Sequence, residues 1–177
     1  MLYRAEFGTD DISNTIGNVR FPESYPFMPM NGVAVVRWET PVVCFVDGGE
    51  GDYASSNIGA RVVSAKLRSL ICEFSIGQAD IQWLPVSIDL TSGREEYYAF
   101  HFSQCHSVVD SSRSKFLSTG ALITPVFKKK IVADLPLFAI PGKSTFEFFA
   151  RCDLVAKIVS AGISGIMFKE IPEERLA

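Results

Sequence analysis

Histidine is scarce in this chain, whose 177 residues include only His101 and His106. Its four cysteines are Cys44, Cys72, Cys105 and Cys152. None of them forms a CxxC pair, which argues against a redox motif and against a zinc ribbon. No apolar run approaches the length of a membrane span, and the first residues lack the basic start and apolar segment of a signal peptide. We therefore expect a cytoplasmic protein with reduced cysteines and no membrane contact.

Residues for catalysis or metal binding are equally sparse. The glycine-rich stretch at 48–51 lacks the Lys-Ser/Thr pair that follows in a phosphate-binding loop. His101, Cys105, His106 and Asp110 are of types that bind zinc or act in catalysis. On a strand, however, positions 101 and 105 face the side opposite to 106, so these groups converge only if the chain bends sharply. We assign no catalytic, metal-binding or cofactor-binding residue, and a small enzyme built on this region stays an alternative.

The charge balance argues against nucleic acid as a partner. The chain carries 17 basic and 20 acidic residues, a net charge of −3, whereas binding to phosphate backbones needs clustered Lys and Arg. The one basic run, at 128–130, is typical of a solvated strand end. By contrast, the 14 Phe within a 47% hydrophobic composition predict a large core, an apolar interface or both.

Hydrophobic periodicity predicts a helix and a hairpin in the middle of the chain. Apolar residues recur at helical spacing over 65–74, and Ser64 is a suitable N-cap for this helix. Residues 81–90 and 95–103 alternate as strands do, with Ser92-Gly93 as the turn between them.

A weak internal repeat is the most informative pattern. Residues 63–86 and 150–171 each read as a short amphipathic helix, a turn and a strand with an aromatic residue in its middle. Leu67 in the first copy corresponds to Leu154 in the second, and Trp83 corresponds to Phe168. The last strand is expected over 166–171.

The remaining segments complete an α+β fold with a mixed, largely antiparallel sheet and two or three packed helices. The first thirty residues are rich in turn formers, and three prolines keep an arm at 21–30 extended. Strand-like sequence runs over 32–46, with a break at Pro41, and again over 123–132. Because no linker interrupts the composition, we read residues 1–177 as one domain, with N-terminal strands and the arm in 1–58.

Residues 59–171 resemble a known family. The segments that carry the resemblance are 59–67, 81–86 with the Tyr97-Tyr98 pair, 108–110 with Ser114, 137–138, and 165–171 after the closing helix. In their order and spacing they are similar to the immunity proteins of bacterial polymorphic toxin systems, specifically the large family typified by a myxobacterial immunity domain. The resemblance implies stoichiometric binding to a cognate toxin, without turnover and without a cofactor.

Toxins of this kind are often nucleases with basic clefts, so the resemblance favours an acidic contact surface. The candidate partner-binding residues are the loop acids Asp47, Glu50 and Asp52, the strand acids Glu95 and Glu96, and, as a rival surface on the arm, Tyr25 and Phe27. An adaptor of a secretion system is a further alternative, and a homodimer stays open.

Overall fold

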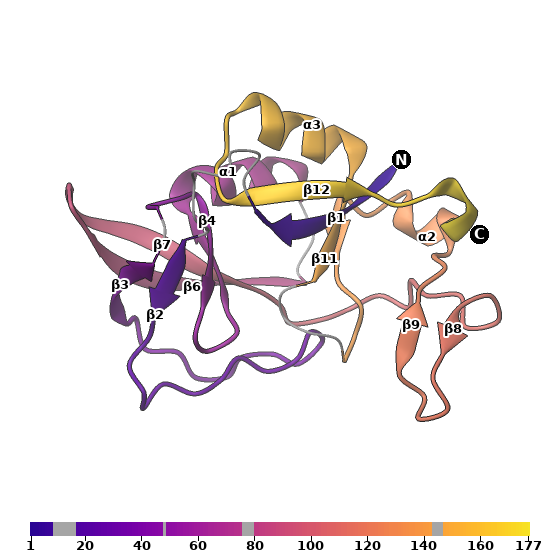
Figure 1. The fold of residues 1–177 in the computed structure, drawn as a ribbon, viewed down its shortest axis with the longest axis horizontal. Coiled ribbons are helices and arrows are strands. Elements are labelled where there is room, and N and C mark those ends of the chain that lie inside the picture. The colour runs from indigo at the N-terminus through magenta and orange to yellow at the C-terminus, as the bar shows by residue number, and fades with distance from the viewer. Residues whose placement is uncertain (9–16, 48, 76–79, 143–146) are drawn as a thin grey trace.

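The strands form a barrel, a separate four-stranded sheet and a small hairpin (Figure 1). The computed structural model describes residues 1–8, 17–47, 49–75, 80–142 and 147–177. The helices of the described chain are α1 (Ala65–Phe74), α2 (Lys129–Val132) and α3 (Cys152–Ser160), followed by a 3₁₀ turn at Glu173–Arg175. The predicted α+β class, with largely antiparallel sheets and two substantial helices, is confirmed.

The barrel closes six strands in the order β2-β3-β6-β7-β5-β4. Their bounds are β2 Asn18–Arg20, β3 Val42–Asp47, β4 Tyr53–Ser56, β5 Arg61–Ser64, β6 Ile81–Leu90 and β7 Gly93–Phe102. Pairing is antiparallel except between β3 and β6 and between β2 and β4, and the latter pair closes the barrel. Alternate side chains such as Val62, Val86 and Ile88 fill its interior. Barrel closure depends on these long-range pairings and was not predicted.

The second sheet has the order β10-β11-β1-β12, and all its pairings are antiparallel. Its strands are β10 (Leu137–Phe138), β11 (Phe148–Arg151), β1 (Leu2–Phe7) and β12 (Ile166–Glu170). The first thirty residues, being rich in turn formers, were expected to be irregular, and this was wrong for residues 2–7 and 18–20, which form β1 and β2. β1 lies inside this sheet, where Leu2 and Ala5 are buried in different hydrophobic clusters on its two faces, while Arg4 forms an ion pair with Glu6 on the face of Leu2.

The internal repeat is confirmed as two strand–helix–strand units, β5-α1-β6 and β11-α3-β12. In both units the two strands pair with one middle strand, β7 in the first and β1 in the second. Leu67 and Leu154 occupy matching buried positions on their helices. The helices α1 and α3 contact each other, so the two units pack together through their helical sides.

The elements predicted in the middle of the chain agree closely with the structure. The helix spans Ala65–Phe74 as expected, and the Ser64 side chain accepts a hydrogen bond from the Leu67 N–H at 3.2 Å. The hairpin pairs Leu90 with Gly93 across its turn. Trp83 and Phe100 lie opposite each other, with their rings stacked 5.0 Å apart.

Two strand predictions were wrong. Over 123–132 the sequence forms β9 (Leu122–Thr124), which pairs with β8 (Lys115–Phe116), and then α2. Pro125 lacks the N–H that would continue the ladder, so the strand ends before it, and the lysine run enters α2 instead of ending a strand. Residues 32–41 form no strand, because their backbone hydrogen bonds, such as those to the Phe102 carbonyl and the Gln82 side chain, are isolated and do not continue into a ladder. The strand predicted over 32–46 is present only from residue 42, as β3.

Candidate partner-binding surfaces

Residues 21–41 form an extended strap across the barrel. Its backbone N–H groups donate to the barrel at two points, Met28 to the Ile58 carbonyl (2.8 Å) and Gly32 to the Phe102 carbonyl (2.9 Å). The Gln82 amide holds both backbone groups of Val35, at 2.8 and 3.0 Å. These bonds fix the path of the strap along its length.

The strap continues to β6 through Trp38, whose indole N–H donates to the Pro85 carbonyl at 2.8 Å. Its ring meets the rings of Phe21 and Tyr25 edge-on, at 6.1 and 5.2 Å. Phe21 is buried against the barrel core, so this aromatic group clamps both ends of the strap.

The two strap aromatics singled out from the sequence have different surroundings. Tyr25 packs in the aromatic group, and its hydroxyl donates to the Glu39 carbonyl. Phe27 is 79% exposed. Tyr25 therefore holds the strap in place, whereas Phe27 is available to a partner. Other strap side chains, which no sequence pattern singles out, join Phe27 at the surface: Met30 is 61% exposed and Val36 is 92% exposed.

A buried cation, Arg61, contacts the strap from the side of the core. Arg61 is fully buried on β5, and its guanidinium donates to the Asn31 side-chain oxygen at 2.9 Å. The rings of Phe100, Phe102 and Phe148 lie 5.0, 5.3 and 5.6 Å from it. Burial lowers the pKa of Arg61 to about 10, which keeps it charged at neutral pH. Among the described residues no carboxylate pairs with it.

Two loop acids, Glu50 and Asp52, and the strand acid Glu95 lie near enough to Tyr97 for their charges to act on its hydroxyl. Burial, followed by the charges of Asp52, Glu95 and Glu50, raises the pKa of Tyr97 to about 12. The Glu50 carboxylate accepts from the Thr91 N–H at 2.9 Å. Within the described chain, none of these three carboxylates forms an ion pair.

Asp52 also has a structural role. It accepts from the Ser64 hydroxyl at 2.6 Å and from the Ser164 N–H at 3.2 Å, and so joins the start of α1 to the loop before β12. The strand acids separate, because adjacent residues face opposite sides: Glu96 lies near Tyr98, whose pKa it raises. Asp47 ends β3, and its side chain lies outside the described structure.

The four residues of the enzyme alternative have separate partners. His101 is buried and bonds to the Val33 carbonyl at 2.7 Å, while His106 bonds to Asp80 at 2.6 Å. Burial raises the pKa of Cys105 to about 11, so its thiol is protonated at neutral pH. Asp110 accepts from the N–H of Ser112, two residues along, at 3.0 Å. These contacts supply no activated thiolate, and no nucleophile–base pair forms among them.

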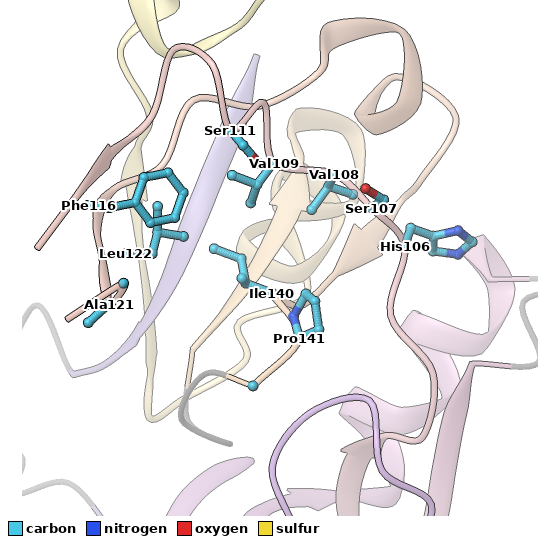
Figure 2. Close-up of a pocket in the computed structure, with 12 residues that line it drawn as sticks. His106, Ser107, Val108, Val109, Ser111, Phe116, Ala121, Leu122, Ile140 and Pro141 are labelled. Carbon is cyan, nitrogen blue, oxygen red and sulfur yellow. The ribbon is translucent and has the colours of Figure 1, made fainter. Parts of the chain in front are cut away.

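A groove of about 440 Å³ lies between the β8–β9 hairpin and residues 140–142 (Figure 2). Figure 2 shows that Val109, Leu122 and Ile140 make its walls apolar, with His106 at one end. Among the described residues, no group of three or more His, Cys, Asp or Glu side chains is placed to hold a metal ion. Nor does any described helix combine the length and apolar character needed to cross a bilayer.

Comparison with protein-family models gave no match, and comparison with curated protein sequences gave none either. The assignment of a function therefore depends on the surfaces described above and on the resemblance of residues 59–171.

Proposed function

We propose that this chain neutralises a secreted bacterial toxin by binding it stoichiometrically, as an immunity protein does. The resemblance of residues 59–171 suggests this class of protein. The observation that carries the proposal is the strap, whose backbone is fixed to the barrel while Phe27, Met30 and Val36 remain open to solvent.

A fixed backbone with exposed apolar side chains suits protein binding for a physical reason. Apolar side chains gain free energy when a partner covers them, and a preorganised segment loses little conformational entropy on binding. Aromatic side chains such as Phe27 are frequent anchors at the centres of interfaces. A solvated linker would not need the hydrogen bonds that Gln82 and Phe102 make to the strap.

The acidic group around Tyr97 indicates the chemistry of the partner. Glu50, Asp52 and Glu95 belong to separate segments and all act electrostatically on Tyr97, and no described cation forms an ion pair with them. Such a surface attracts a basic cleft and accelerates encounter with it. A toxin that cleaves nucleic acid has such a cleft, where carboxylates can occupy the positions of phosphates.

The first test is co-expression with the protein encoded immediately beside this gene. Growth rescue together with co-purification of a stoichiometric complex is the expected result. If the neighbour is not toxic and no complex forms, the proposal fails. Binding to a secretion component whether or not a toxin is present would instead identify an adaptor.

Paired substitutions then locate the contact. Phe27→Ala is expected to weaken toxin binding at least tenfold, whereas Leu117→Ala, at a site 54% exposed in the loop between β8 and β9, serves as the control. Glu95→Lys is expected to slow association, with Glu174→Lys as its control. Equal affinities within the first pair, measured by calorimetry, would exclude the strap as the contact.

A further inference from the structure

Strand β12 leaves one edge open. It pairs with β1 on one side, and on the other side no described segment pairs with it. In Figure 1 it runs along the outside of the sheet beside β1. The matching strand of the first repeat unit, β6, has no such edge, because residues 87–89 pair with β3. The two units therefore differ at this point, since an added strand covers only the first.

The hydrogen-bonding direction of each β12 residue follows from its neighbours. The Ile171 N–H donates to the Leu2 carbonyl at 2.9 Å, and the Gly8 N–H donates to the Gly165 carbonyl at 3.3 Å. In an antiparallel ladder, bonded and non-bonded pairs alternate. The backbone groups of Met167 and Lys169 therefore point towards β1. Those of residues 166, 168 and 170 point outwards, to the open edge.

An apolar groove of about 570 Å³ accompanies this edge. It lies between α3 and β12, and its lining includes Val159 and Met167, which are 65% and 37% exposed. Small side chains at Ala156 and Ser160 border it on the helix. The open strand edge and the apolar groove lie together, as they do where a sheet is extended by another chain.

We propose that β12 pairs antiparallel with β12 of a second copy of this chain, about a two-fold axis at Phe168. In this register residue 168 faces its own copy, and residue 166 faces residue 170. All three outward-pointing residues are then matched, which gives about six backbone hydrogen bonds. The axis stands perpendicular to the sheet, so both α3 helices lie on the same face, next to both grooves.

The neighbouring registers are unfavourable, which is why a second copy fits at this one position. Moving the axis one residue towards the C-terminus sets Lys169 against Lys169 and brings Pro172, which has no N–H, into the ladder. Moving it one residue towards the N-terminus requires Ser164, whose N–H and carbonyl already bond to Asp52 and Tyr53. In the proposed register Lys169 faces Met167, so no like charges meet.

The mass of the chain in solution tests this proposal, independently of toxin binding. We expect a dimer by sedimentation for the unmodified chain. Glu170→Pro removes an outward N–H and leaves the β1 pairing intact, so it should raise the dimer dissociation constant at least tenfold. Glu170→Ala keeps that N–H and should remain dimeric. A monomer at the highest soluble concentration, a dimeric Glu170→Pro or a monomeric Glu170→Ala would each overturn the proposal.

A cross-linking measurement covers the case in which Glu170→Pro does not fold. In a Cys44→Ser background, the double variant Met167→Cys with Lys169→Cys places cysteines opposite each other across the axis, close enough for disulfides. Oxidation should yield a covalent dimer. Each single variant should give no covalent dimer, because residue 167 faces residue 169 of the other copy and neither residue faces itself. Failure of the double variant to cross-link, or cross-linking of both single variants, would contradict the register.

Discussion

At the scale of single residues, a buried imidazole and a buried cation lie near each other beneath the strap. His101 Nε2 donates to the Val33 carbonyl, because a carbonyl oxygen can only accept. Its other ring nitrogen, Nδ1, has no hydrogen-bond partner among the described residues. Burial first, and the charge of Arg61 in addition, lower the pKa of His101. The neutral ring is therefore the form that holds the strap.

This arrangement predicts a loss of stability in acid. Because the folded chain binds a proton on His101 less readily than the unfolded chain does, the free energy of unfolding should fall as the pH drops below about 6.5. The decline should continue until the lowered pKa of the folded state is reached. Urea unfolding at several pH values between about 8 and 5, the range in which histidine titrates, measures this change in the free energy of unfolding.

A substitution that keeps the hydrogen bond to the strap tests the acid effect. His101→Gln should flatten the pH dependence, since an amide can donate to Val33 without titrating near neutral pH. An unchanged slope in His101→Gln would show that other groups cause the acid loss.

At the scale of elements, the turn from α3 into β12 depends on one glycine. Gly165 has φ +82°, and a Cβ there would lie 2.1 Å from the Tyr53 carbonyl oxygen of β4. Gly165→Ala should therefore destabilise the fold by roughly 3 kcal/mol, through overpacking and backbone strain together. Gly142→Ala separates these causes, because Gly142 has φ +67° and no atom within 4 Å of its added Cβ. The Gly142→Ala variant should lose only about 1 kcal/mol of its free energy of unfolding. Equal losses in the two variants, measured by urea unfolding, would refute the steric argument.

Elements with local signals could be predicted from the sequence, and those that depend on distant partners could not. Helix α1 has its periodicity and its Ser64 cap within a dozen residues. Strand β1, in contrast, mixes Arg4 and Glu6 with buried Leu2, and it becomes a strand because β11 and β12 flank it. The acidic group around Tyr97 likewise needs the β6–β7 hairpin to bring Glu95 near Glu50. No spacing in the sequence indicates that the hairpin and the loop lie close together.

At the scale of the whole molecule, one hydrophobic cluster joins the barrel to the second sheet. It combines Tyr53, Val63 and Phe100 of the barrel with Phe148 and Leu154 of the second repeat unit. The Phe148 and Phe100 rings meet edge-on at 5.4 Å. Neither the barrel nor the second sheet could keep these side chains from water by itself, so we expect the barrel and the second sheet to unfold together.

Phe148→Ala tests this coupling. The lost ring should lower the free energy of unfolding by about 3–5 kcal/mol. Both tryptophans, Trp38 and Trp83, pack on the barrel, so their fluorescence reports barrel unfolding. In the variant the fluorescence transition should shift to lower denaturant concentration. The transition in far-ultraviolet circular dichroism, which reports the barrel and the second sheet together, should shift with it. Val36→Ala, at a side chain 92% exposed, should shift neither. If the dichroism shifted while the tryptophan transition kept its midpoint, the barrel would be folding without the second sheet.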